Sequence, residues 1–356
     1  MDAIVVTRDD RQPRVVDRPR PEPGPGEALV RTLRVGVDGT DHEVVAGDHG
    51  GFPDGSDELV LGHEAVGVVA DANGTGLTKG QVVVPTVRRP RGEPSSAFER
   101  GEADMAAPGD YVERGIDGAH GFMAEYFTSP ADCLVPVPDD LADRGFLVEP
   151  ISITEKALEL AFASRSAFDW QPETALVLGN GSLGLLTLGM LDQRADFESL
   201  YCLGRRDRPD PTIDIVEELG ATYVDSRETP VGEIPDAHEP ADLVYEATGH
   251  ARHAFETVEA LAPNGVGALL GVPAGDWRFE VAGSDIHRQL VLQNKALVGS
   301  VNSNAGHFAA AVDTLAALPD WLLDDVVTSV HDLGDVQAAF RDDETTIKTA
   351  LQFHSQ

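Results

Sequence analysis

Hydrophobic and polar residues alternate in short runs along the first part of the chain, and these runs predict β-strands. Strand patterns cover residues 3–7, 27–37, 65–70 and 81–84, and turns rich in glycine and proline, such as 21–26, separate them. The start of the chain has the pattern of a first strand and not of a signal peptide. A β-rich domain is therefore expected here.

The pattern changes near Ile151, where helical segments begin to alternate with short aliphatic strands. Helices are predicted at 152–163, 211–219 and 254–261. Strands are predicted at 174–178, 200–204, 242–246, 266–271 and 296–301. This alternation favours an α/β domain with a doubly wound parallel sheet.

The tail after Val301 is too short for a third domain. It contains helical patterns at 307–318 and 336–341 and a strand pattern at 348–353, and we expect it to complete the first domain. The predicted domains are therefore 1–155 together with 303–356, and 156–302.

A glycine-rich motif follows the predicted strand 174–178. It reads Gly179-Asn180-Gly181-Ser182-Leu183-Gly184 and leads into an apolar helix. Glycines at such a turn let the N–H groups at the helix N-terminus meet a pyrophosphate. A glycine-rich turn without a ligand is the alternative, but the strand before and the helix after it favour dinucleotide binding.

The next strand, 200–204, runs into Arg205, Arg206, Asp207 and Arg208. NAD-specific sites place an acidic residue at this point, whereas guanidinium groups suit the 2′-phosphate of NADP. The motif therefore favours NADP. NAD stays open because Asp207 can reach a 2′-hydroxyl, and solvated loop arginines are the remaining alternative.

A second candidate for chemistry is Gly62-His63-Glu64, preceded by Asp38-Gly39-Thr40-Asp41. Imidazole and carboxylate groups form a competent ligand set for zinc, which acts as a Lewis acid when one coordination position stays open. The alternative is that His63 only packs at the start of a strand and that Asp38 only ends one. This motif alone does not decide between them.

The composition is strongly acidic. There are 61 Asp and Glu against 27 Lys and Arg, a formal net charge of −34, and lysine occurs only at Lys79, Lys156, Lys295 and Lys348. Such a surface repels itself in dilute buffer and is relieved by molar salt, and it excludes nucleic acid as a partner. The 42% hydrophobic residues argue against disorder.

The two cysteines, Cys133 and Cys202, have no paired spacing. No disulfide framework is expected, which fits a reducing cytoplasm. No apolar run approaches the length of a membrane-spanning helix, so no membrane partner is expected.

Several segments, in order, resemble the medium-chain zinc-dependent alcohol and polyol dehydrogenases, and among them the glucose 1-dehydrogenases of salt-loving archaea. The resemblance covers essentially the whole chain. Its segments are Asp38-Gly39-Thr40-Asp41, Gly62 through Gly67, Gly80-Gln81-Val82, Leu147-Val148-Glu149-Pro150, Gly179 through Gly184, and Gly299-Ser300-Val301-Asn302.

The resemblance implies a GroES-like catalytic domain, a Rossmann dinucleotide-binding domain and a sugar substrate. The implied reaction is oxidation of an aldose, D-glucose at C1 to gluconolactone, with NADP as the acceptor. Another zinc-dependent polyol or pentose dehydrogenase is the alternative, and a non-enzymatic NADP-binding protein is a more distant one. The family forms dimers and tetramers, so a homo-oligomer is expected, with pairing of the sheet edge near 295–301.

The resemblance also implies one catalytic zinc, held by Asp38, His63 and Glu149 with Glu64 beside them. Whether Glu64 or Glu149 ligates the metal at each catalytic stage stays open. Relatives have cysteine at the position of Asp38, and a carboxylate there discriminates less against manganese and magnesium. Relatives bind a structural zinc through four cysteines in the lobe that corresponds to 88–116. This lobe contains no cysteine, so that site is predicted to be absent.

The implied roles are a proton relay for Thr40, orientation of the His63 ring for Asp41, and sugar contact for Glu113 and Asn302. A Thr40 that only packs or caps after a strand and a solvated Glu113 are the alternatives. The implied substrate contacts are therefore Thr40, Glu64, Glu113, Glu149 and Asn302. The implied cofactor contacts are Gly179, Asn180, Gly181, Ser182, Leu183, Gly184, Arg205, Arg206, Arg208, Thr248, Gly271, Val272, Ser300, Val301 and Asn302.

Overall fold

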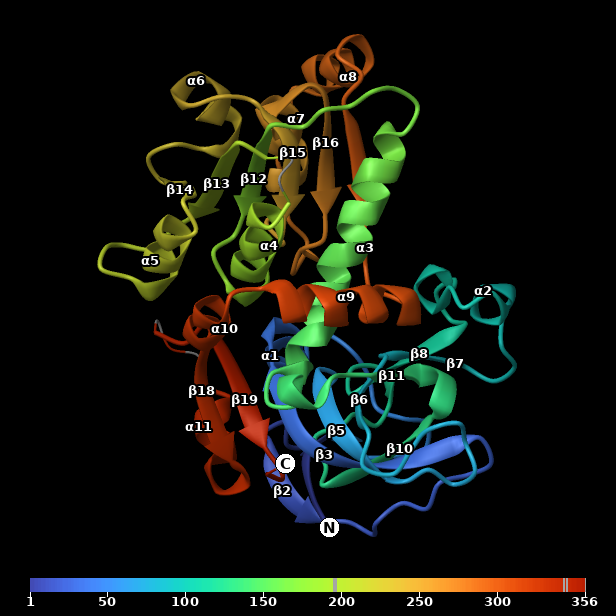
Figure 1. The fold of residues 1–356 in the computed structure, drawn as a ribbon. Helices are drawn as coiled ribbons and strands as arrows, with labels where there is room; N and C mark the ends of the chain where they lie inside the picture. Colours follow the sequence, from blue (N-terminus) through green and yellow to red (C-terminus); the bar gives the residue numbers. More distant parts are fainter. Residues whose placement is uncertain (195–196, 342, 344, 356) are drawn as a thin grey trace. The chain divides into compact units, whose positions relative to one another are not determined.

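The computed structural model describes residues 1–194, 197–341, 343 and 345–355, and these fold into two compact units (Figure 1). Unit 1 comprises Met1–Ser152, Asn302–Ala316 and Val327–Gln356, and unit 2 comprises Ile153–Val301 and Ala317–Val326. The predicted boundaries differ mainly at 317–326. This segment packs in unit 2, where a Cβ on Gly189 would lie 2.4 Å from the Leu322 side chain.

Unit 1 is β-rich, as predicted, and its largest sheet is built on the long strand β3 (Glu27–Val37). The strand order is β11-β6-β5-β3-β19-β18, and β10 also pairs with β3. Most side chains of β3 are buried, because neighbouring elements cover both of its faces. The other strands of this sheet are β5 (Ala65–Asp71), β6 (Val82–Pro85), β10 (Tyr126–Pro130), β11 (Leu134–Pro136), β18 (Val327–Asp332) and β19 (Lys348–Gln352).

Two three-stranded sheets and short helices complete unit 1. The sheets have the orders β2-β1-β4 and β7-β8-β9. Their strands are β1 (Asp2–Thr7), β2 (Arg14–Asp17), β4 (Glu58–Val60), β7 (Arg88–Pro90), β8 (Tyr111–Arg114) and β9 (Gly118–Ala119). The helices are α1 (Gly39–Ala46), α2 (Ser96–Glu99), α9 (Ala305–Ala317) and α11 (Val336–Ala339), and α3 (Val148–Arg165) begins here and continues into unit 2.

Unit 2 contains the predicted doubly wound sheet. Its six parallel strands have the order β14-β13-β12-β15-β16-β17, so the order reverses between β12 and β15. The strands are β12 (Thr174–Leu178), β13 (Ser199–Gly204), β14 (Thr222–Asp225), β15 (Ala241–Glu246), β16 (Leu261–Leu269) and β17 (Ala296–Gly299). The helices are α4 (Ser182–Asp192), α5 (Pro211–Glu218), α6 (Ile234–Ala237), α7 (His253–Ala260), α8 (Gly283–Leu292) and α10 (Asp320–Val326).

Several elements were not predicted. Strands β14 and β18 and helices α1 and α10 lie in segments with no strong hydrophobic period, and packing against their neighbours stabilises them. Helix α8 was also not predicted, and none of its residues is buried. The start of β16 at Leu261 also differs from the expected 266, because this strand continues directly from α7. Among the residues described, no helix is both long and apolar enough to cross a membrane.

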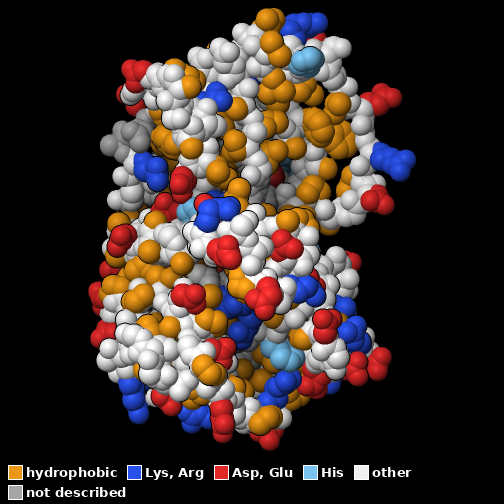
Figure 2. Space-filling view, turned by 90° about the vertical axis from the view of Figure 1, so that its right-hand side faces the viewer, with side chains coloured by type: hydrophobic (Ala, Val, Ile, Leu, Met, Phe, Trp, Pro, Cys, Tyr) orange, Lys and Arg blue, Asp and Glu red, His pale blue; other side chains and the backbone are white. Residues whose placement is uncertain are grey.

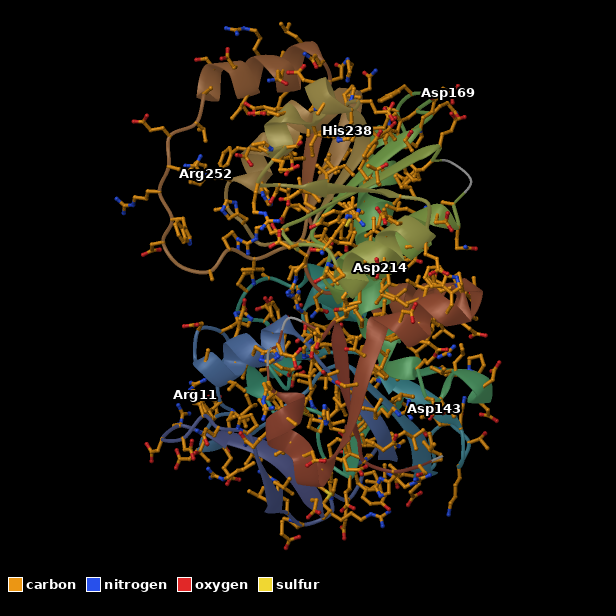
Figure 3. All side chains as sticks on the ribbon, turned by 90° about the vertical axis from the view of Figure 1, so that its left-hand side faces the viewer. Arg11, Asp143, Asp169, Asp214, His238 and Arg252 are labelled. Atoms are coloured by element: carbon orange, nitrogen blue, oxygen red, sulfur yellow. The ribbon has the colours of Figure 1, made fainter. Side chains whose placement is uncertain are left out.

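The rare lysines and the abundant acids occupy different parts of the fold. Lys156, Lys295 and Lys348 are buried, and only Lys79 is exposed. Within the described part of the chain only six Asp and Glu residues are buried, whereas residues such as Asp169 and Asp214 lie on the outside of unit 2 (Figure 3). The negative charge is therefore a property of the surface.

Candidate metal and cofactor sites

The strand pairing of unit 1 brings together segments that are far apart in the sequence. At the end of β3, Val37 pairs with Thr349 of β19 and Val35 pairs with Ala65 of β5. Asp38 follows β3, Glu64 precedes β5 and Lys348 begins β19. The sheet therefore places these three side chains around one point.

Helix α1 contributes two carboxylates to the same place through its N-terminal cap. Asp38 is the N-cap, its Oδ1 accepts the N–H of Asp41 at 3.0 Å, and Asp41 Oδ2 accepts the N–H of Asp38 at 3.2 Å. The second oxygens face the His63 ring, with Asp38 Oδ2 3.6 Å from Nε2 and Asp41 Oδ1 3.7 Å from Nδ1. Since Asp38 caps the helix, the capping alternative for Thr40 is wrong.

Glu64 is fixed from two sides. Its Oε2 lies 2.5 Å from the Nζ atom of Lys348, and both side chains are 1% exposed. On the other side a Cβ on Gly36 would lie 2.0 Å from the same oxygen, so only glycine leaves room for the carboxylate. The carboxyl group of Glu149, in the first turn of α3, is also buried.

The electrostatics of this cluster couple its members. Burial disfavours the charged form of His63, but the carboxylates of Asp38 and Asp41 outweigh burial and hold the pKa of the ring well above its ordinary value. Burial raises the pKa of Glu64 to about 7 and that of Glu149 to about 8. Without another cation, these two carboxyl groups bind protons near neutral pH.

These residues fit a divalent metal ion. One ligand atom each from Asp38, His63 and Glu64 lies within 4.8 Å of the others. The buried His63 Nδ1 and Asp41 Oδ1 atoms have no hydrogen-bond partner in the described part of the chain, so the histidine is not a satisfied core residue. With Nε2 on a metal, Nδ1 would donate to Asp41, as ligating histidines usually donate to a carboxylate.

Zinc affinity is expected to rise as pH increases from about 6 to about 8. The reason is that Glu64 and Glu149, with pKa values of about 7 and about 8, and the His63 ring, whose pKa lies well above its ordinary value, must lose their protons to bind the cation. Competition with a chelator of known affinity at several pH values measures this dependence. Glu149→Gln should flatten its upper part, and an affinity independent of pH would contradict the expectation.

Glu113 and Asn302 are brought together in unit 1. Glu113 Oε1 accepts a hydrogen bond from Asn302 Nδ2 at 3.2 Å and from Arg88 Nε at 3.0 Å. Its side chain is 14% exposed, which argues against the solvated alternative. In the cysteine-free lobe, Arg88 of β7 also donates to the carbonyl oxygen of Asp104 at 2.9 Å, so this arginine links β7 to the short helical turn Ala103–Met105 as well as to β8.

The glycine-rich motif of unit 2 forms a tight turn between β12 and α4. Gly179 has a φ of 113°, and Gly181 is the N-cap of α4. A Cβ on Gly184 would lie 1.9 Å from the carbonyl oxygen of Gly179, so helix and strand approach each other only because this residue is glycine. Asn180 is fixed by donating to Thr212 Oγ1 at 2.6 Å.

The arginines after β13 differ in their surroundings. Arg208 pairs with Glu217 and Asp207 pairs with Arg227, at 2.6 Å for the second pair. Arg206 lies 3.9 Å from Asp210, and Arg205 is exposed with no carboxylate of the described residues at ion-pair distance. Arg205 and Arg206 are therefore the guanidinium groups available to a 2′-phosphate.

The other implied cofactor residues of unit 2 follow the carboxyl ends of β15, β16 and β17, where doubly wound sheets bind their ligands. Thr248 donates its N–H to Glu246 Oε1 at 2.8 Å, and a Cβ on Gly271 would lie 2.0 Å from the Gly249 nitrogen. Val272 and Val301 are exposed, whereas the Ser300 hydroxyl is buried without a hydrogen-bond partner among the described residues. Asn302 belongs to unit 1.

Sequence reasoning did not assign a role to Lys348. A signal was present. Lys348 is one of only four lysines in the chain, and it lies at the first residue of the predicted strand 348–353. The structure supplies the role, since Lys348 is the buried partner of Glu64.

Comparison with known proteins places the two units in a family. Residues 24–139 match the Alcohol dehydrogenase GroES-like domain, and residues 142–353 match the Glucose dehydrogenase C-terminus. The chain is 72% identical to a glucose 1-dehydrogenase of Halobacterium salinarum over all of both chains, and 40% identical to one of Thermoproteus tenax over 95% of each. The structure of Haloferax mediterranei glucose dehydrogenase in complex with NADP, Zn and gluconolactone is 64% identical, with a TM-score of 0.98 and complete coverage of both chains. The chain therefore belongs to the medium-chain zinc-dependent dehydrogenase family, in the branch that carries the glucose dehydrogenase C-terminal domain.

Proposed function

We propose that this protein is a zinc-dependent, NADP-preferring glucose 1-dehydrogenase that oxidises D-glucose at C1 to gluconolactone. The observation that carries the proposal is the cluster of the partly buried Asp38 with the buried His63 and Glu64, in a chain 64% identical to an enzyme solved with NADP, Zn and gluconolactone. The glycine-rich turn of unit 2 supports a dinucleotide as the hydride acceptor.

In this proposal Asp38 and His63 hold the zinc together with Glu149 or Glu64. The three ligand atoms that lie within 4.8 Å of one another belong to Asp38, His63 and Glu64, and Glu149 lies buried in the first turn of α3. Bound zinc supplies a Lewis acid that lowers the pKa of the C1 hydroxyl, and bound NADP accepts the hydride. Asp41 keeps the Nε2 lone pair of His63 available by accepting from Nδ1. Thr40, one residue before Asp41 in the first turn of α1, would pass the hydroxyl proton toward solvent.

Glu113 and Asn302 are proposed to bind the sugar. Their mutual hydrogen bond leaves one oxygen of the Glu113 carboxylate, Oε2, for a sugar hydroxyl, and Arg88 fixes the orientation of the group. Carboxylate and amide groups held in this way select substrates by hydrogen bonding rather than by size.

Initial rates with a panel of aldoses and polyols, each with NADP and NAD in molar KCl, test the proposal. Glucose with NADP should give the highest kcat/KM, and dialysis against a chelator should remove activity that Zn²⁺ restores. A higher kcat/KM with a pentose or a sugar alcohol would assign the enzyme to another substrate, and absence of turnover with every substrate would favour a non-enzymatic protein.

Replacement of Arg205 and Arg206 by alanine is expected to weaken NADP binding and leave NAD binding unchanged. Removal of each charge-assisted hydrogen bond to the 2′-phosphate should reduce the binding free energy by about 1–3 kcal/mol. Equilibrium titration of both nucleotides measures the change. Arg208→Ala is the matched control, because Arg208 already pairs with Glu217. An unchanged ratio of NADP to NAD affinity in the double variant would assign both arginines to the solvated loop.

We also propose a cytoplasmic homo-oligomer that forms through the edge of the unit 2 sheet. Strand β17 is the last strand of the sheet, and α8 next to it in sequence has no buried residue. Leu292 and Leu297 are exposed there, and Figure 2 shows hydrophobic side chains gathered over unit 2 in its upper half. The free cysteines Cys133 and Cys202 fit a reducing compartment.

Light scattering in molar KCl tests this assembly. The native chain should be a dimer or tetramer, and a Leu292→Asp/Leu297→Asp variant should have a smaller mass. Val15→Asp, which places a charge at an exposed apolar residue of unit 1, is the control and should not change the mass. A monomeric native chain would refute the assembly.

A further inference from the structure

Lys348 lies inside the proposed metal site and has no role in the reaction described above. It begins β19, and the pairing of Thr349 with Val37 places it beside Asp38. Its ammonium group is 2.5 Å from Glu64 Oε2, with both side chains 1% exposed. A buried lysine at this position is a fixed positive charge that solvent does not screen.

The charges of the site explain why such a group is needed. Asp38 and Asp41 face the imidazole of His63, and the buried Glu64 and Glu149 carboxyl groups interact electrostatically with it. Buried carboxylates without cations are strongly destabilising. The ammonium group of Lys348 neutralises the Glu64 carboxylate when that carboxylate is ionised. A divalent cation would bring two further positive charges to the same carboxylates. The Lys348 ammonium group and the metal ion would therefore both attract the Glu64 carboxylate.

We propose that Lys348 is a positioning residue that stabilises the metal-free site and competes with the metal for the Glu64 carboxylate. It holds this carboxylate through the ion pair, so a metal ion can recruit Glu64 only by weakening that pair. Lys348 therefore makes the protein more stable without zinc and makes zinc binding weaker than the remaining ligands would allow. This inference rests on the proposed function in one respect, that zinc occupies the cluster of Asp38 and His63.

Lys295 shows what a purely structural buried lysine looks like in the same chain. Its Nζ atom donates to the carbonyl oxygen of Val258 at 2.7 Å and to Gln289 Oε1 at 2.9 Å, and both partners are uncharged. It belongs to unit 2 and does not contribute to the metal cluster of unit 1. Lys295→Met is therefore the matched control for Lys348→Met.

The test compares the zinc dissociation constants of the native chain, Lys348→Met, Lys348→Arg and Lys295→Met, by chelator competition at one slightly alkaline pH in molar KCl. Thermal midpoints of the metal-free proteins are measured in parallel. Lys348→Met should bind zinc about tenfold more tightly or better, since a repelling charge a few ångströms from the ion is removed, and should unfold at a lower temperature without metal. Lys348→Arg keeps the positive charge and should have native zinc affinity. Lys295→Met should lower the thermal midpoint without changing zinc affinity.

If Lys348→Met is not obtained metal-free, the zinc-loaded variant is challenged with excess chelator and should lose zinc more slowly than the native chain. Zinc affinity that is unchanged or weaker in Lys348→Met, or zinc loss at an equal or faster rate, would overturn the inference and leave the proposed function standing. A native chain that binds no zinc would overturn the proposed function itself.

Discussion

Replacement of His63 by alanine is expected to abolish glucose oxidation and zinc binding while NADP still binds. His63 is the one nitrogen ligand in a cluster of carboxylates, and its ring lies between Asp38 and Asp41. Loss of Lewis-acid stabilisation of the developing alkoxide should raise the barrier by about 4 kcal/mol or more, which is about a thousandfold in rate. The glycine-rich turn that is proposed to bind the nucleotide belongs to unit 2, so the affinity for NADP should not change.

The measurements are kcat with glucose, zinc content per chain and the NADP dissociation constant. His42→Ala is the matched control, because His42 lies in α1 next to Asp41 and its ring packs against Phe340, with centroids 6.0 Å apart. It should retain both zinc and activity. Full activity of the native enzyme with less than about a tenth of a zinc ion per chain would refute the metal-dependent reaction.

Thermal stability is expected to rise steeply with KCl concentration. The net charge of −34 lies on the surface. Among the residues that the structure describes, only six Asp and Glu residues are buried, whereas three of the four lysines are buried. The Debye length falls from about 10 Å at 0.1 M to about 3 Å at 1 M, so most repulsion between carboxylates is screened by molar salt. Any further gain at higher KCl has to come from cations among the carboxylates or from a stronger hydrophobic effect.

Thermal midpoints measured against KCl concentration check this expectation. A variant in which several exposed acids such as Asp169 and Asp214 become lysine should need less salt for the same midpoint, because each substitution removes repulsion. Equal stability of the native chain in millimolar and molar KCl would show that the acidity has another cause.

The sequence alone determined the fold class and predicted a candidate nucleotide site, because both rest on local signals. Strand 174–178, the glycines after it and the apolar helix that follows are adjacent in the chain, so backbone conformation and hydrophobic period predict the turn directly. The acidic surface is likewise a matter of composition. Elements with weak periodicity, such as α1 and β14, could not be predicted, because packing against neighbours stabilises them.

The tertiary structure decided what surrounds the metal ligands. The sequence showed Asp38 and His63 as candidates, but only the pairing of β19 with β3 brings Lys348 from the far end of the chain to Glu64. The sequence also showed three arginines after β13, but only the tertiary structure shows that Arg208 pairs with Glu217. Such contacts join residues that are far apart in the sequence. Sheet register and helix packing determine them, so the spacing of residues along the chain does not predict them.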